Sequence, residues 1–324
     1  MSRDASRPAP AAQQGVVLAQ FLGMGLIWGA SFLFMRVALD GTSPLQIAWT
    51  RLVLGALALA VAVVATRSPL PTTPALWAHF VVVGVVGCSV PFTLFAWAEQ
   101  HVTSSIASIL NATTPLMTAL MVTLAFRVER LDRDRVTGLV VGIVGVVVIC
   151  APWRLGGAGG ASEVAGQLAC LGAALCYGVM FAYLRRFVTP RGVPPVTTAF
   201  LQVGFGAAAL LLLTPWVVTA PVRLTPAIVG SLAVLGVLGT GVAYLWNVRV
   251  LLSWGPTAAS TVTYITPVVG VVLGVLVLDE PLSWYEPAGA VLVLLGVVLT
   301  QGRLRRRAWP HARRRVDAVQ PPRP

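Results

Sequence analysis

The stretch from Ser104 to Leu131 reads SSIASILNATTPLMTALMVTLAFRVERL, and a related stretch from Pro256 to Leu282 reads PTAASTVTYITPVVGVVLGVLVLDEPL. Thr114-Pro115 in the first stretch is matched by Thr266-Pro267 in the second, at a shift of 152 residues. Each copy is an apolar run of about the 20 residues that a membrane-spanning helix needs. A central proline removes a backbone donor and clashes with the preceding turn, so Pro115 and Pro267 are predicted hinges at which each helix kinks or breaks.

The composition places the whole chain in a membrane. Of its 324 residues, 57% are hydrophobic and only 10% are charged, which leaves too little polar surface to cover a soluble core. The formal net charge of +12 would suggest nucleic acid as a partner of a soluble protein. Here the arginines lie in short loops and one tail, which has a topological explanation. The sequence therefore predicts an integral membrane protein without a nucleic-acid partner.

Apolar runs of spanning length divide the chain into ten segments, with nine as the alternative because several runs are short or tightly linked. The predicted fold is all-α, with ten transmembrane helices arranged as two inverted five-helix repeats. The segments lie at Val16 to Leu39, Leu45 to Thr66, Leu76 to Ala98, Ser104 to Phe126, Val136 to Ala151, Val164 to Leu184, Val196 to Val218, Ile228 to Leu252, Thr257 to Leu278 and Trp284 to Gln301.

The distribution of arginine predicts the orientation. If the ten segments alternate, 19 of the 23 arginines share the side of the N-terminus, and three (Arg36, Arg154 and Arg223) lie on the other side. Arg51 falls within a segment. Because cytoplasmic loops of membrane proteins are enriched in basic residues, both termini are expected in the cytoplasm, and the chain is expected in the inner or plasma membrane.

The halves correspond beyond the proline segments. Trp28-Gly29 is echoed by Tyr177-Gly178 at a shift of 149, and Arg51 is echoed by Gln202 at 151. Five helices per half is an odd number, so the second half is expected upside down, with the binding site between the halves. The predicted divisions are an N-terminal tail (1–15), a first repeat (16–151), a Gly-rich linker (152–163), a second repeat (164–301) and a basic tail (302–324).

The chain resembles the EamA-type branch of the drug/metabolite transporter superfamily. The resemblance is carried by WGASF at 28–32, by TTP at 113–115 and ITP at 265–267, and by VERL at 128–131 and DEPL at 279–282. It implies an EamA-like repeat in each half, a transporter that moves amino acids, other metabolites or toxic cations outward, often against a proton gradient, and helices five and ten as a homodimer face. The family's frequent ALKY before the fourth helix is AEQH here, at 98–101.

Small residues four apart, as in Gly25/Gly29, Gly138/Gly142 and Gly270/Gly274, allow close helix packing. We expect this spacing to serve contacts within the chain, and the homodimer face is the alternative.

A set of polar and aromatic residues at mid-membrane depth forms the predicted substrate site. Buried amides need a partner helix or a cavity, and the alternative to cavity lining is hydrogen bonding across helices. Such a lining would suit a small zwitterion or an amphipathic cation. The predicted substrate-binding residues are Trp28, Ser31, Phe32, Arg51, Asn111, Thr114, Tyr177, Phe181, Tyr244, Asn247 and Tyr264.

Charged residues near the site leave alternatives open. Arg51 is predicted either to receive a substrate carboxylate or to pair with Glu99 or backbone carbonyls. Glu99 is a proton-coupling candidate, and its other interpretation is a boundary residue or the partner of Arg51. Glu129 and Glu280 directly follow the two proline segments and are expected to cap helices.

The sequence predicts a secondary active transporter that exports a small metabolite, such as an amino acid or an amphipathic cation, by alternating access, and exchange for protons is its candidate coupling. It shows no clustered residues for catalysis, no metal-ligand spacing and no ATP-binding or other cofactor motif, so no enzyme activity, metal or cofactor is expected. Its partners are a small-molecule substrate and the lipid bilayer. The alternatives are a non-transporting membrane scaffold and a membrane-embedded enzyme.

Overall fold

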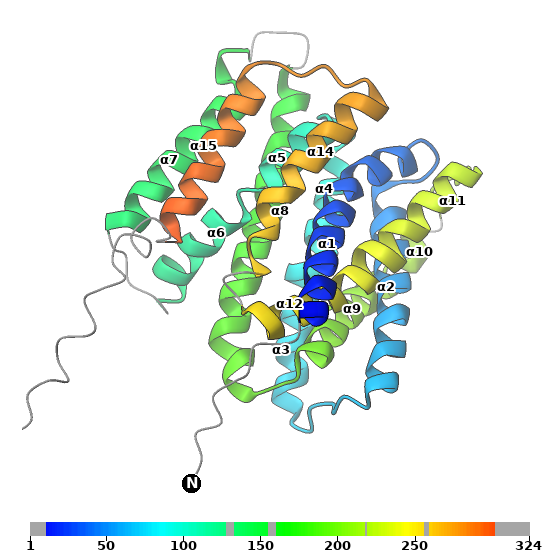
Figure 1. The fold of residues 1–324 in the computed structure, drawn as a ribbon. Coiled ribbons are helices and arrows are strands. Elements are labelled where there is room, and N and C mark those ends of the chain that lie inside the picture. The colour runs from blue at the N-terminus through cyan, green and yellow to red at the C-terminus, as the bar shows by residue number, and fades with distance from the viewer. Residues whose placement is uncertain (1–10, 128–132, 155–159, 218, 256–258, 302–324) are drawn as a thin grey trace, which may run out of the picture.

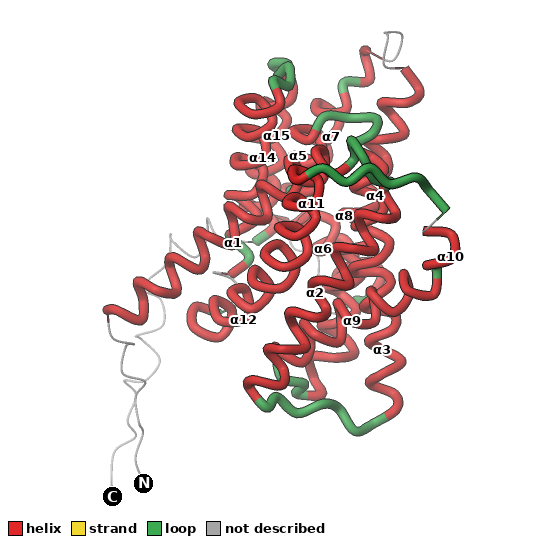
Figure 2. The backbone as a smooth tube through the Cα atoms, turned by 90° about the vertical axis from the view of Figure 1, so that its right-hand side faces the viewer, coloured by secondary structure: helices red, strands yellow, loops and turns green. Residues whose placement is uncertain are grey.

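A computed structural model describes residues 11–127, 133–154, 160–217, 219–255 and 259–301 of the chain. Within those ranges every regular element is a helix (Figure 1, Figure 2). Seven helical segments are long and apolar enough to cross a membrane, and two shorter apolar helices follow them. The predicted all-α membrane fold is thus confirmed. Residues 1–10 of the N-terminal tail, residues 155–159 of the Gly-rich linker, Glu129 and the basic tail (302–324) lie outside these ranges.

The helices follow the apolar runs of the sequence. In the first half they are α1 (Ala11–Ala38), α2 (Pro44–Thr66), α3 (Pro74–Gly84), η1 (Val85–Ser89), α4 (Val90–Ala98), α5 (Ser104–Asn111), α6 (Thr114–Leu120), η2 (Met121–Ala125) and α7 (Arg133–Cys150). The short η3 (Pro152–Arg154) precedes the second half. There they are α8 (Gly160–Tyr183), η4 (Leu184–Val188), η5 (Thr189–Arg191), α9 (Pro195–Leu212), α10 (Thr214–Val217), α11 (Pro226–Ala233), η6 (Val234–Val242), α12 (Ala243–Trp254), α14 (Val262–Leu278) and α15 (Tyr285–Thr300).

Local chemistry sets the start of several helices. Proline is favoured in the first turn because its missing N–H would have no partner there. A Ser or Thr just before it can cap the helix, as Ser43 caps α2: its Oγ accepts a hydrogen bond from Gln46 N at 3.3 Å. The Gln46 Oε1 accepts one from Ser43 N in return, at 2.8 Å. The hydroxyl of Thr225 caps α11 in the same way.

The first predicted proline hinge coincides with a break in the helix. The segment that begins at Ser104 is divided into α5 and α6 by Ala112 and Thr113, just before Pro115. At Pro267, by contrast, α14 continues without interruption, so the matching break expected there is absent. Because α14 begins only at Val262, the carbonyl that Pro267 leaves without a donor belongs to its first turn, where the distortion is small.

The glycine-rich face of α7 packs against that of α15, and Figure 1 shows the two helices side by side at one flank of the molecule. A Cβ built at Gly138 would lie 2.6 Å from the carbonyl oxygen of Gly296, and one built at Gly145 would lie 2.9 Å from that of Gly289. At the shift of 151, Gly138 corresponds to Gly289 and Gly145 to Gly296. Exchanging the two halves therefore turns each contact into the other.

Two further pairs of contacts show the same exchange. Gly55 packs against Thr240 and Gly206 against Cys88, while Gly29 packs against Val269 and Gly178 against Met117. These pairs are related by shifts of 149 to 152 residues. The two halves are thus related by a pseudo-twofold axis, and the glycine spacing serves contacts within the chain.

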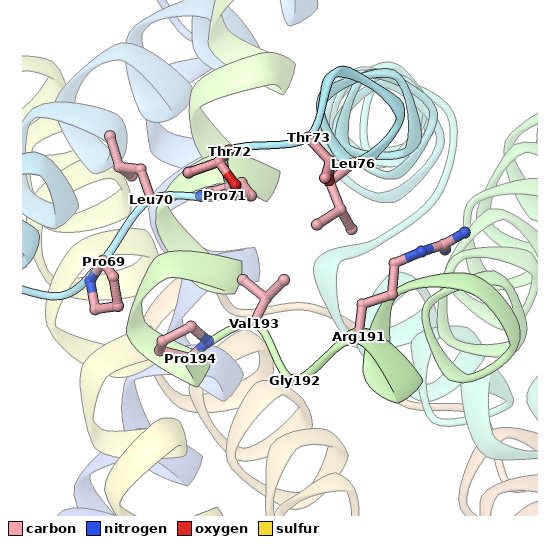
Figure 3. A pocket seen from close by; sticks show the side chains of 10 residues that line it. All are labelled: Pro69, Leu70, Pro71, Thr72, Thr73, Leu76, Arg191, Gly192, Val193 and Pro194. Atoms are coloured by element: carbon pink, nitrogen blue, oxygen red, sulfur yellow. The ribbon is translucent and has the colours of Figure 1, made fainter.

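The connecting loops gather at two opposite ends (Figure 2). At one end, the loop of Gly41 receives a backbone hydrogen bond from Arg223 N at 2.8 Å. At the other end, the hydroxyl of Thr197 donates to the Pro69 carbonyl oxygen at 2.9 Å. Residues 69–73 and 191–194 enclose a pocket of about 520 Å³ there, with Leu76 beside it (Figure 3). At the shifts of 151 and 152, Gly41 corresponds to Gly192 and Arg223 to Pro71, so the two ends are built from corresponding loops.

The α7 and α15 contact yields a stability prediction. We expect Gly145→Ala to lower the free energy of unfolding by about 1–3 kcal/mol, because the new Cβ would lie 2.7 Å from the backbone nitrogen of Val293. Thermal unfolding in nanodiscs should show a lower melting temperature. The matched control is Gly230→Ala, whose Cβ would meet nothing within 4 Å. Equal melting temperatures for the two variants would contradict the close contact.

Candidate functional site

Arg51 of α2 lies at the interface between the halves. Its side chain is 7% exposed, and its Nε donates a hydrogen bond to the Thr240 hydroxyl of η6 at 3.1 Å. Its guanidinium carbon lies 4.0 Å from the centre of the Phe92 ring of α4. A cation placed over an aromatic face is attracted by the electrons of the ring. Thr240 and Phe92 therefore position the guanidinium from two sides.

The corresponding place in the other half holds neutral groups. Gln202 of α9 occupies the position of Arg51, and its Nε2 approaches the sulfur of Cys88 at 3.6 Å. Cys88 in η1 corresponds to Thr240 in η6 at the shift of 152. Arg51 with Thr240 and Gln202 with Cys88 are thus equivalent pairs about the pseudo-twofold axis. The site is symmetric in its backbone and asymmetric in its charge.

Thr240 and Cys88, which accept from Arg51 and Gln202, lie on π-helical turns. Val85–Ser89 and Val234–Val242 are both π-helical, and the first range falls within the second when shifted by 152. The wider turn lets the Thr240 hydroxyl donate to the Leu235 carbonyl, five residues earlier, at 3.1 Å. Its oxygen remains available to accept from Arg51. Single π-helical turns inside α-helices often occur at functional sites.

Aromatic rings line the site from both halves. Trp28 and Tyr244 have ring centres 6.1 Å apart, and the equivalent pair in the other half, Tyr177 and Phe92, has ring centres 6.5 Å apart. Trp28 Nε1 also donates to the Gly239 carbonyl at 3.0 Å. This bond ties α1 of the first half to η6 of the second. The rings supply apolar and π-electron surface beside the Arg51 charge.

Two more of the predicted site residues, Phe32 and Ser31, pack near this aromatic group. Phe32 contacts Phe95 edge to face at 5.6 Å, and Phe95 stacks on Tyr177 at 6.2 Å. The Ser31 hydroxyl donates to the Ile27 carbonyl at 2.9 Å, and a Cβ on Gly239 would lie 3.3 Å from its oxygen and 3.8 Å from an Arg51 terminal nitrogen. Trp28, Ser31, Phe32, Tyr177 and Tyr244 are therefore gathered in the region of Arg51.

The predicted pairing of Arg51 with Glu99 is not formed. Among the described residues, both carboxylate oxygens of Glu99 lack a hydrogen-bond partner. Of the Arg51 nitrogens, only Nε donates a hydrogen bond to a described residue. The side chain also makes no bond to a backbone carbonyl in that part of the chain. The terminal nitrogens of Arg51 thus have no hydrogen-bond partner among the described residues.

Other predicted residues lie elsewhere. Phe181 is 48% exposed on the outside of α8, and its position corresponds to the buried Phe32. Tyr264 donates its hydroxyl to Gln301 Oε1 at 3.1 Å, a bond between α14 and the end of α15. Asn111 and Thr114 flank the break between α5 and α6, and the Thr114 hydroxyl is buried without a hydrogen-bond partner among the described residues. Asn247, on α12, is partly buried.

Three residues of the site, Phe92, Thr240 and Cys88, are not among the predicted substrate-binding residues. A signal for Phe92 was present, since it corresponds to the predicted Tyr244 at the same shift of 152 as the two prolines. Cys88 and Thr240 correspond only to each other at that shift, so no candidate pointed to them.

The Arg51 geometry predicts that its charge costs stability. Removing a cation from water costs several kcal/mol, whereas one ring contact and one hydrogen bond return about 2 kcal/mol each. We therefore expect Arg51→Met to melt at or above the wild-type temperature. Thr240→Val should lower the free energy of unfolding by about 1–3 kcal/mol in the wild-type background, because it leaves Arg51 Nε without an acceptor. The same substitution should lower it less in Arg51→Met, which has no guanidinium to satisfy. A large loss of stability in Arg51→Met would instead indicate a structural ion.

Comparisons with known proteins agree with this architecture. Residues 14–151 and 164–301 each match the EamA-like transporter family. The uncharacterized transporter YdfC of Bacillus subtilis is 26% identical over 89% of both chains. The uncharacterized inner membrane transporter YedA of Escherichia coli K12 is 26% identical over 85% of this chain and 87% of its own.

A probable terminal-alkyne amino-acid exporter of Streptantibioticus cattleyicolor is 30% identical over 88% of this chain and 95% of its own. A crystal structure that is 20% identical covers 91% of this chain and 99% of its own, with a TM-score of 0.60, and shows the same fold. The matches to both halves confirm the resemblance carried by the sequence motifs. The chain belongs to the EamA-like transporter family.

Proposed function

We propose that this protein is a secondary active transporter that exports a small zwitterionic metabolite of the amino-acid type by alternating access, in exchange for protons. The observation that carries this proposal is Arg51, the one buried cation among the described residues, in a site otherwise built from equivalent residues of the two halves. Its terminal nitrogens donate no hydrogen bond to any described residue. They suit a carboxylate, which accepts two parallel bonds from a guanidinium.

The aromatic rings around Arg51 complete the recognition of a zwitterion. Trp28, Tyr177 and Tyr244 present π faces and edges from both halves, and such surfaces attract an ammonium group or an apolar side chain. A simple organic cation would meet repulsion from the guanidinium, so we favour an amino acid over an amphipathic cation. The 30% identical relative named as a probable amino-acid exporter supports the same class.

The exchange of contacts between the halves supports alternating access. Arg51 and Phe92 are 7% and 5% exposed, so a substrate reaches them only after the halves separate on one side. Each end is held by its own pair of loops, and the two closures are equivalent under the pseudo-twofold axis. Opening one end while the other stays closed gives the two states of a transporter. The break before Pro115 supplies a hinge, and Pro267 is the second candidate.

The contacts also support ten alternating spans. Gly25 and Gly29 of α1 pack against Ile265 and Val269 of α14, so the residue numbers rise together and the helices run parallel. In α7 and α15 the contacting numbers run in opposite directions. Alternating spans require the first and ninth helices to be parallel and the fifth and tenth to be antiparallel. Together with the arginine distribution, this supports a cytoplasmic location for both termini.

Counterflow in liposomes tests the substrate class. We expect exchange of an aromatic amino acid, and Arg51→Gln should raise its apparent KM by roughly 10- to 150-fold, the range for hydrogen bonds to a charged group. The amine analogue of that amino acid, which lacks the carboxylate, should bind Arg51→Gln with unchanged affinity. Arg223→Gln is the matched control, because Arg223 is exposed at one end.

Two outcomes would contradict the proposal. An unchanged KM in Arg51→Gln would remove Arg51 from the substrate site. Absence of exchange for a broad panel of amino acids, amines and other metabolites at two pH values would favour a non-transporting scaffold.

Cysteine labelling tests the orientation. On a background without the four native cysteines, Val222→Cys should react with an impermeant maleimide in intact cells, and Thr72→Cys should react only after permeabilisation. Both positions are exposed, and they lie in the loops that form opposite ends of the molecule. The reverse pattern would invert the proposed topology, and labelling of both in intact cells would contradict the alternation of spans.

A further inference from the structure

One carboxylate of the second half binds the start of a helix of the first half. Glu280 follows α14, and its Oε1 accepts a hydrogen bond from Ser104 N at 2.7 Å. Its Oε2 accepts from Ser105 N at 3.0 Å and from the Ser105 hydroxyl at 2.6 Å. The positive end of a helix favours an anion at this place. Glu280 thus caps α5, whereas sequence analysis expected it to cap the helix that follows it.

The contact continues along α5 and α14. A Cβ at Gly274 would collide with both the Ser105 hydroxyl and the Glu280 carboxylate, and one at Gly270 would collide with the Ser108 hydroxyl. The Ser108 hydroxyl also donates to the Thr266 carbonyl at 3.3 Å. Ser105 and Ser108 are fully buried. This end of the interface between the halves is therefore closed, and the three bonds to Glu280 lie at its edge.

A second carboxyl lies close by without partners. Glu99 directly follows the span Pro74–Ala98, is fully buried, and neither of its oxygens has a hydrogen-bond partner in the described ranges. The hydroxyl of Ser104, at the start of α5, is likewise buried and unpartnered there. Burial, and next the Glu280 carboxylate, raise the pKa of Glu99 above the usual range of a glutamate. A buried carboxyl without donors is much less costly when it is neutral.

The other groups that act on Glu99 come from three helices. Arg36 of α1 donates through Nη1 to the backbone carbonyl of Glu99, and Arg51 of α2 acts from the substrate site. Both favour the charged form of Glu99, but neither forms an ion pair with its carboxylate. The Cys170 thiol of α8 also interacts electrostatically with Glu99. The carboxylate of Glu280 favours the neutral form.

We propose that Glu99 and Glu280 form a proton-operated latch between the two halves. With Glu99 neutral, Glu280 remains bound to the start of α5 and this end is closed. Loss of the Glu99 proton places a second negative charge beside Glu280. A charged Glu99 also competes for the donors of α5 and requires hydration. Both effects weaken the bond between the halves and open this end.

The direction of the pH dependence follows from proton binding. The closed state holds the Glu99 proton more tightly than an open, hydrated state, in which its pKa is ordinary. Closure is therefore fully favoured below the ordinary pKa of a glutamate and is lost as the pH rises through the pKa of the closed state. The latch rests on the proposed proton exchange. The proposed topology is needed only to assign the end at Glu280 and α5 to the outer side of the membrane.

Distance measurement between spin labels tests the latch without a substrate. Gln100→Cys and Leu282→Cys, on the background without native cysteines, place labels at exposed positions on either side of the contact between α5 and α14. The protein is reconstituted in nanodiscs and measured by double electron–electron resonance between about pH 4.5 and about pH 8.5. The readout is the ratio of the long-distance to the short-distance population.

In the protein with native Glu99 and Glu280, we expect this ratio to rise at least about tenfold across the range, which corresponds to one unit of pKa difference between the states. Glu99→Gln should stay at the short distance at every pH, and Glu99→Asp should restore the pH dependence. Glu280→Gln should raise the long-distance population at every pH. A pH-independent ratio with native Glu99, or a wild-type pH dependence in Glu99→Gln, would overturn the latch.

The matched control is Glu163→Gln. It removes a carboxylate of α8 that accepts a hydrogen bond from Gln167 of the same helix. It should keep the wild-type pH dependence. Melting temperatures measured in parallel identify any variant that fails to fold, and Glu99→Asp then decides the outcome. Failure of counterflow together with a pH-dependent ratio would reject the proposed function and retain the latch. Successful counterflow together with a pH-independent ratio would reject the latch alone.

Discussion

The structure depends on the close approach of backbones across the interface between its two halves. Glycine on α7 meets glycine on α15, and the same exchange of contacts recurs between α2 and η6 and between α3 and α9. In a membrane, lipid tails are as apolar as leucine, so helices gain little by hiding apolar side chains from them. Van der Waals contact at short range then decides which helices pack together. Glycine allows that contact because it has no Cβ.

Equivalent packing creates an interface with equivalent walls, and the chemistry of the site lies in the departures from equivalence. Arg51 faces Thr240 on one side of the pseudo-twofold axis, while Gln202 faces Cys88 on the other. A charge at that depth is stabilised by one hydrogen bond and one ring. Structural burial of such a charge without a carboxylate would be unfavourable, and polar groups inside membranes generally mark the path of a ligand or ion.

The second departure from equivalence lies at the start of α5. Glu280 closes one end by binding backbone and hydroxyl donors, and Glu99 lies buried beside it without a partner. The residue that corresponds to Glu99 in the other half is Leu251 at the shift of 152. A titratable group at only one end would let the two closures respond differently to protons. In an exchanger, that difference would connect the substrate site around Arg51 to the proton gradient.

Much of this protein follows from its sequence alone. Apolar runs, arginine positions and the repeated Thr-Pro segments predict an all-helical membrane protein of two related halves, because helix length and periodicity are local properties. They also single out Arg51, since a charge inside an apolar run is costly unless it is paired or faces water. Tertiary structure decided what those residues contact: Arg51 binds Thr240 and Phe92 and not Glu99, Phe181 lies outside, and Glu280 caps α5. Such contacts join positions more than a hundred residues apart and depend on how helices rotate against one another, which no local pattern specifies.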